Sequence, residues 1–305
     1  MSPLLARRLR LASGLVLLAY LTTHLSNHAL GLVSLDAMED GREWFLALWR
    51  NPLATAALYI SLVVHVLLAF WTLYRRSHLR MPAWEASQLV LGLAIPPLLV
   101  GHIVGTRLAY TLFDVTDSYG RVVLTLWHLA PRFGVRQAVV LLVAWTHACI
   151  GIHFWLRLRP WYRPVAPVLF AVGLLLPALA LLGFAEAGRE VSTLARTPGW
   201  VEGFPQATAP ERGVLAQIND WLFWGTVRLV SERGVLIGPR SPYGGVRGSD
   251  SSASKMAAAT EAVSASGRSR WRVADSVSMK LYGALSAASP ARKSVRKSTT
   301  RFFVP

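Results

Sequence analysis

Five stretches of the chain are apolar over about the length that a membrane-crossing helix needs. A hydrocarbon core of about 30 Å is crossed by roughly 20 helical residues, and each stretch has few or no charges over that length. They are Leu11–Val33, Leu53–Tyr74, Gln88–Ala109, Val139–Arg159 and Val165–Ala185. The pattern predicts an all-α fold, a polytopic transmembrane helical bundle with five spans.

A sixth stretch, Gly213–Ile237, has a weaker apolar pattern, because Asp220 and Arg228 interrupt the run NDWLFWGTVRLV. Two readings remain open, a sixth span or an amphipathic helix lying in the membrane interface. A basic tail follows, and basic segments are attracted to the anionic inner surface of a membrane, which favours the span.

The composition agrees with a membrane protein. Of the 305 residues, 53% are hydrophobic, and the mean hydropathy of +0.40 lies above the usual range of soluble domains. The first stretch is too long for the apolar region of a secretory signal, and no small-residue cleavage site closes it. We therefore expect Leu11–Val33 to remain in the protein as a span.

The net charge of +16 is unevenly distributed. The segment Pro239–Pro305 holds 12 Lys and Arg residues against three Asp and Glu residues, which is more than half of the excess. From Ser241 onward no periodic apolar face is present, so we expect a transmembrane domain over residues 1–240 and a disordered basic tail over 241–305. Aromatic residues in the tail are too sparse for specific nucleic-acid binding, and attraction to anionic lipid is the expected consequence.

Three arginine clusters fall on one side of the predicted up-and-down path. They are Arg7, Arg8 and Arg10, then Arg75, Arg76 and Arg80, then Arg157, Arg159 and Arg163. The positive-inside rule assigns this side, and the N-terminus with it, to the cytoplasm. The loops Ser34–Pro52 and Tyr110–Val135 mix acids and bases and are expected to face outward.

Four of the five spans carry a histidine near mid-depth: His24, His65, His102 and His147. Ionisable side chains inside spans usually face the bundle interior, a cavity or a cofactor. At about 1.5 Å rise per residue, His24 and His102 lie roughly 20 Å from the cytoplasmic ends of their helices, and His65 and His147 lie roughly 15–18 Å from the outer ends. The depths predict two pairs, His24 with His102 and His65 with His147. A neutral histidine bonded to a neighbouring helix is the alternative in each case.

Two imidazoles that face each other across a bundle suit haem iron. Zinc fits less well, because no Cys, Asp or Glu lies at mid-depth to complete a tetrahedral set. Cys149 is the only cysteine, which excludes an internal disulfide, a cysteine zinc site and a cysteine-ligated iron–sulfur cluster. The remaining histidines are treated as non-ligands: His28, His78, His128 and His153. Of these, His28 is the main alternative ligand, because it shares a helix face with His24.

Gly101 and Gly105, in the run GHIVGTR, form a small-xxx-small pair. Such a pair lets a flat macrocycle approach the backbone closely, although packing of a second helix is its commoner use.

These runs resemble the di-haem cytochrome b anchors of fumarate reductases and succinate dehydrogenases. SGLVLLAYLTTH (Ser13–His24), with Gly14 ten positions before the histidine, is similar to their first histidine helix. VVHVLLAFWTLYRR (Val63–Arg76) and THACIGIHFWLR (Thr146–Arg157) are similar to two others. The resemblance implies two b-type haems, one held by His24 and His102 and the other by His65 and His147.

The chain resembles still more closely the haem-type membrane anchors that precede the catalytic domains of some bacterial class III adenylate cyclases. The similar features are six spans, the GHIVGTR run and the NDWLFWG run. The resemblance implies a bacterial plasma-membrane protein that exchanges electrons with quinone, beside a cytoplasmic iron–sulfur or cyclase domain or subunit. No catalytic constellation follows residue 240, which suggests a truncation or an altered reading frame, or a genuinely short protein. Arg107 would pair with a haem propionate, or else snorkel to the interface as an ordinary arginine.

Three functional hypotheses remain open. The first is the sensory anchor of an adenylate cyclase, the second is the cytochrome b subunit of a respiratory complex, and the third is a haem-free helical anchor.

Overall fold

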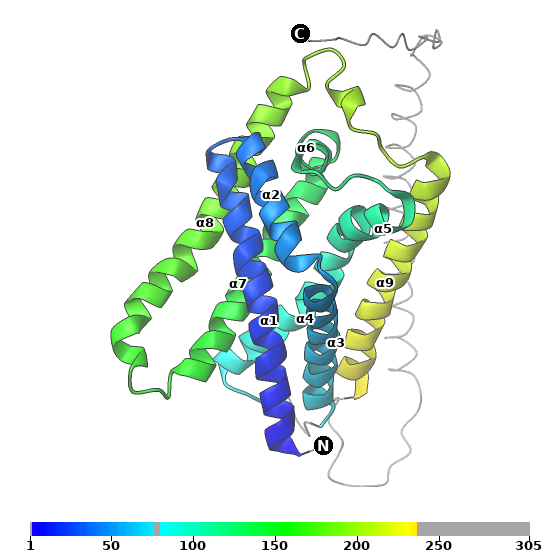
Figure 1. Ribbon diagram of the computed structural model, residues 1–305. Coiled ribbons are helices and arrows are strands. Elements are labelled where there is room, and N and C mark those ends of the chain that lie inside the picture. Colours follow the sequence, from blue (N-terminus) through cyan, green and yellow to red (C-terminus); the bar gives the residue numbers. More distant parts are fainter. Residues whose placement is uncertain (1, 76–79, 237–305) are drawn as a thin grey trace, which may run out of the picture. The chain divides into compact units, whose positions relative to one another are not determined.

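The computed structural model describes residues 2–75 and 80–236, which belong to one unit, Met1–Arg240. Over these residues the chain forms helices and turns and no β-strand. The helices are α1 Pro3–Ala29, α2 Leu35–Trp49, α3 Pro52–Tyr74, α4 Ala83–Ile103, α5 Ala109–Phe113, α6 Tyr119–Val123, α7 Pro131–Leu156, α8 Tyr162–Leu194 and α9 Ala209–Leu236 (Figure 1). The expected disordered tail, 241–305, lies outside the described residues.

Four helical segments are long and apolar enough to cross a membrane: Pro52–Tyr74, Ala83–Phe113, Pro131–Leu156 and Tyr162–Leu194. Each contains most or all of one predicted span. The remaining predicted span is helical too, since α1 covers most of Leu11–Val33. The stretch Gly213–Ile237, expected to be either a sixth span or an interfacial helix, is helical over nearly all of its length in α9. Whether these two helices cross the membrane stays a prediction, because arginines and other polar residues lower their hydropathy.

Local sequence explains where several of these helices begin. Pro3, Pro52 and Pro131 open α1, α3 and α7, where the proline ring suits the first helical turn and its missing N–H costs no bond. The side chain of Asn51 also caps α3 by accepting a hydrogen bond from the backbone N–H of Ala54 at 2.9 Å.

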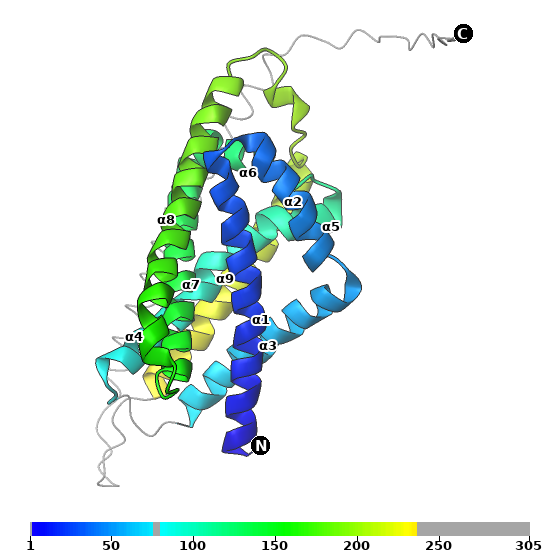
Figure 2. The same cartoon turned by 60° about the vertical axis from the view of Figure 1, so that its left-hand side comes forward.

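Two groups of helices pack side by side. One group is α1 with α3 and α8, and the other is α4 with α7 and α9, while α7 also contacts α8 (Figures 1 and 2). A π-helical turn, Val104–Leu108, interrupts the long segment between α4 and α5. Such turns re-aim the side chains around them and are frequent at functional sites. This one begins two residues after His102.

The segments expected to be outward loops, Ser34–Pro52 and Tyr110–Val135, contain helices. Helix α2 is capped by Ser34, whose hydroxyl accepts from the N–H of Ala37 at 3.0 Å. Its apolar face buries Leu35 and Met38 in a cluster with α6 and α8. Helix α2 was not predicted, because its apolar residues form one helix face among charged neighbours rather than a long apolar run.

Candidate functional site

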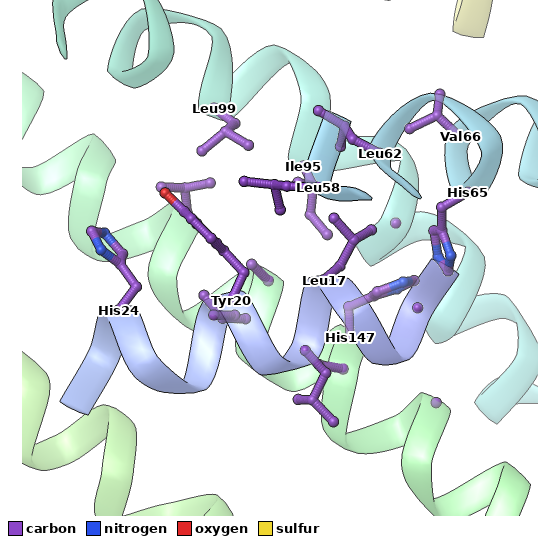
Figure 3. Close-up of a pocket in the computed structure, with 18 of the residues that line it drawn as sticks. Leu17, Tyr20, His24, Leu58, Leu62, His65, Val66, Ile95, Leu99 and His147 are labelled. Carbon is purple, nitrogen blue, oxygen red and sulfur yellow. The ribbon is translucent and has the colours of Figure 1, made fainter. Parts of the chain in front are cut away.

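A cavity of about 1510 Å³ lies inside the helical unit and is lined by all four predicted site histidines: His24, His65, His102 and His147. Ligand pockets commonly have volumes of roughly 300–1,000 Å³, so this cavity has room for more than one ordinary ligand. Leucine is the commonest residue type along the cavity wall. Figure 3 shows His24 at one end and the rings of His65 and His147 at the other, with Leu17 and Tyr20 between them.

His65 on α3 and His147 on α7 face each other. Their ring centroids are 6.2 Å apart and their planes are nearly perpendicular, at 87°. The structure thus brings together two histidines that are separated by 82 positions in sequence and that the depth estimate placed at one level. We call this pair the His65/His147 site.

Both rings of the His65/His147 site are held from behind by backbone carbonyls of neighbouring helices. Nδ1 of His65 lies 3.2 Å from the carbonyl oxygen of Arg10, and Nδ1 of His147 lies 3.0 Å from that of Gln88. A carbonyl oxygen only accepts, so each Nδ1 carries the proton and each Nε2 keeps its lone pair. This is the tautomer that ligates a metal through Nε2, with the Nδ1–H bond fixing the ring.

Two glycines make room for these rings. A Cβ at Gly14 of α1 would lie 3.2 Å from Cε1 of His65, and one at Gly92 of α4 would lie 2.8 Å from Cε1 of His147. A real Cβ at Gly92 would therefore displace the His147 ring or the helix. A Cβ at Gly14 would require only a small shift of the His65 ring. Gly14 is also the glycine that the resemblance singles out.

His24 on α1 and His102 on α4 form the second pair, which we call the His24/His102 site. Their ring centroids are 6.0 Å apart, with planes tilted by 57°. The ring of Tyr20 stacks on the ring of His24, with centroids 5.8 Å apart, and the centroid of the Phe45 ring of α2 lies 5.3 Å from that of His24. Ser13, which contacts His65, precedes His24 by 11 positions, so the two sites lie about 16 Å apart along α1.

The His24/His102 site contains a third imidazole. Nε2 of His28 lies 3.3 Å from Nε2 of His24, one helical turn away on the same face. Nδ1 of His24 and Nδ1 of His28 are both buried with no hydrogen-bond partner. His28 also lines the cavity, edge-on to the ring of Tyr119 at 5.5 Å.

The spacing within each pair fits one iron atom between two rings. A metal–imidazole bond of about 2 Å, and a further ~1 Å from the ligating nitrogen to the ring centre, separate two axial rings by about 6 Å. The measured separations are 6.2 Å and 6.0 Å. Together with the glycine contacts, the ring separations fit two haems, although the role of the histidines as iron ligands stays a prediction.

Charged residues line both ends of the cavity. Arg107, the predicted propionate partner, lines it at the turn after His102. Arg42 of α2 and Arg50, which follows the last residue of α2, line it as well, and both pair with Asp117. At the His65/His147 end the cavity is lined by further arginines, among them Arg7, Arg8, Arg10, Arg157 and Arg159. An apolar middle with cationic ends suits a flat apolar ligand that carries carboxylates.

The ion pairs of Arg42 and Arg50 with Asp117, beside the cavity, were not predicted from sequence, because both segments were expected to be loops. A signal was present in the sequence, since Arg42 and Arg50 are eight positions apart in GREWFLALWR and so share one helix face.

The pair Gly101 and Gly105 plays a different part from the one expected. A Cβ on Gly101 would collide with the guanidinium of Arg136, and one on Gly105 would meet nothing within 4 Å among the described residues. An arginine side chain, rather than a helix backbone, therefore approaches Gly101. Nε of Arg136 is buried there with no hydrogen-bond partner.

His128 and His153 lie apart from both sites. His128 is exposed, His153 bonds to the hydroxyl of Tyr162 at 2.7 Å, and His78 lies outside the described residues. Over residues 2–75 and 80–236, no group of three or more His, Cys, Asp or Glu side chains converges to hold a metal ion.

Comparison of the chain with protein-family models, with curated proteins and with solved structures gave no significant match. The resemblance to di-haem cytochrome b anchors therefore depends on short motifs and four histidines.

Proposed function

We propose that this chain is a membrane-embedded di-haem cytochrome of the b type that exchanges electrons with quinone. The observation that carries the proposal is the pairing of four histidines from four helices across one cavity, with ring separations of 6.0 Å and 6.2 Å. One haem would be held by His24 and His102 and the other by His65 and His147.

Haem bound in this way supplies reversible one-electron transfer, with no open coordination position for a gas or oxygen. The chain's own residues would bind and orient it. The carbonyls of Arg10 and Gln88 fix the His65 and His147 rings, and Arg107 and Arg50 offer positive charge to carboxylates. The leucines that line the cavity exclude water from its middle.

The biological setting extends the proposal. The resemblance of the GHIVGTR and NDWLFWG runs, with the N-terminus that the arginine clusters predict to be cytoplasmic, favours the sensory anchor of a bacterial adenylate cyclase, in the plasma membrane. The cytochrome b subunit of a respiratory complex is the second candidate. Electron exchange with a partner flavoprotein or iron–sulfur protein would favour this second candidate.

A haem-free anchor is the third candidate. The observation that favours it is that His65 and His147 bond to the backbone of neighbouring helices and His24 bonds to His28, so each ring has a protein partner without iron.

An absorbance spectrum of the purified protein separates the two haem-binding candidates from the haem-free anchor. Expression in haem-replete cells should give a dithionite-reduced spectrum with the α-band of low-spin b haem, and two haems per chain by pyridine haemochrome assay. Protein that folds as a helical bundle but carries no haem would refute the proposal and leave the haem-free anchor.

A further inference from the structure

The two histidine sites differ in how firmly their rings are held. At the His65/His147 site each Nδ1 bonds to a backbone carbonyl, which selects one ring orientation. At the His24/His102 site, Nδ1 of His24 is buried without a partner, and Nε2, the atom that would bind iron, lies 3.3 Å from Nε2 of His28. The protein therefore fixes both Nε2 atoms of the His65/His147 site, whereas Nε2 of His24 is in contact with a second imidazole, that of His28.

His28 shares with His24 two features that bear on ligation. It projects from the same face of α1 into the same cavity, and its Nδ1 is also buried without a partner. The two Nε2 atoms lie 3.3 Å apart, so a small movement of either ring would bring its Nε2 to the position of the other.

We propose that the His24/His102 site has two interchangeable axial ligands on α1, so that either His24 or His28 completes the iron opposite His102. The inference rests on the proposed function. In each arrangement one Nε2–iron bond is present on α1, and the ring that forms it carries its proton on Nδ1. The other ring stays neutral, and exchange breaks one Nε2–iron bond and forms another with no change in electron count.

Neighbouring aromatic rings support both arrangements. Tyr20 and Phe45 pack on His24, while Tyr119 packs edge-on against His28. Each imidazole therefore packs against different aromatic side chains. These contacts would hold its orientation when it is the ligand. From sequence, His28 was expected to be a non-ligand and was the main alternative ligand, because it shares a helix face with His24.

Single and double alanine variants of the full chain test the inference. We expect His24→Ala and His28→Ala each to retain two haems per chain, with a changed low-spin electron paramagnetic resonance signal from the affected haem. We expect His24→Ala/His28→Ala to retain one haem only. The haem at the His65/His147 site reports that each variant is folded, and the exposed His128→Ala is the matched control.

Loss of one haem in either single variant would overturn the inference, because one histidine would then be indispensable. Retention of both haems in the double variant would also overturn it. These outcomes leave the proposed function intact as long as the wild-type chain carries two haems, whereas a haem-free wild type would refute the proposed function itself.

Discussion

The ring of His147 packs over Gly92, so closely that a Cβ on this glycine would lie 2.8 Å from Cε1 of the imidazole. Real Cβ atoms do not approach other atoms so closely, and the ring is also tied to the carbonyl of Gln88. The close approach of α4 thus sets where the His147 ring can lie.

Gly92→Ala should therefore displace His147 and weaken haem binding at the His65/His147 site alone. We expect haem content to fall from two towards one per chain, with the remaining haem unaltered in spectrum. Gly225→Ala is the matched control, because a Cβ at that exposed helical position meets nothing within 4 Å. Equal haem content in the two variants would show that the contact with Gly92 does not position the ligand.

The ring planes predict two distinguishable electron paramagnetic resonance signals. The imidazoles of the His65/His147 site are nearly perpendicular, at 87°, and those of the His24/His102 site are tilted by 57°. Perpendicular axial rings leave the iron orbitals of a low-spin ferric haem nearly degenerate, which gives a highly anisotropic signal. We expect that signal to disappear in His65→Ala and to persist in His102→Ala. The reverse assignment would mean that haem binding reorients the rings.

A buried polar contact ties α1 to the segments outside the predicted spans. Nδ2 of Asn27 donates to the Tyr119 hydroxyl at 2.7 Å and to the Met38 carbonyl at 3.1 Å. Burial raises the pKa of Tyr119 above its ordinary value, so its hydroxyl stays neutral and can accept this bond. Asn27 thus fixes α2 and α6 next to His28.

Asn27→Leu should leave the buried Tyr119 hydroxyl without its donor, at a cost of about 1–3 kcal/mol. The Met38 carbonyl lies inside α2 and keeps its helical bond, so its loss of the Asn27 amide should cost less. We expect a lower thermal midpoint in detergent. Tyr119→Phe removes one of the two bonds and should cost less, and the double variant measures their coupling. Additive effects of the two substitutions would indicate that the bond contributes little.

Arg121 is a second buried side chain that joins segments of this region through hydrogen bonds. Its Nη2 donates to the carbonyl of Gly105 at 3.0 Å and its Nε donates to that of Thr116. Burial lowers the pKa of Arg121, and the carboxylate of Asp117 opposes that change. Arg121→Met should loosen the π-helical turn after His102 and so lower haem affinity at the His24/His102 site. A normal haem content and thermal midpoint in this variant would argue against that connection.

Long apolar runs predicted the helical class and four apolar helices well, because about 20 consecutive apolar residues have few other structural explanations. The same criterion missed α2, whose Leu35 and Met38 are buried on one face of a charged helix. It also missed the pairing of Asp117 with Arg42 and Arg50, which depends on tertiary contacts between two segments read as loops.

Depth along each helix predicted the same two pairs of histidines whose rings face each other, because the rise per residue of a helix is fixed. The fixed rise could not show which ring nitrogen is held. That property depends on the carbonyls of Arg10 and Gln88, which come from other helices. Nor could it show that Nε2 of His28 reaches Nε2 of His24, a contact set by side-chain rotamers.

The central claim is that two histidine pairs each hold one haem, and haem stoichiometry in single-alanine variants tests it most directly. His65→Ala and His147→Ala should each lose the same haem, with the perpendicular-ring signal, and retain the other. His102→Ala should lose the other haem and retain that signal, and His128→Ala should keep both. If His65→Ala and His102→Ala instead lost the same haem, or if all four variants matched a haem-free wild type, the account would be contradicted.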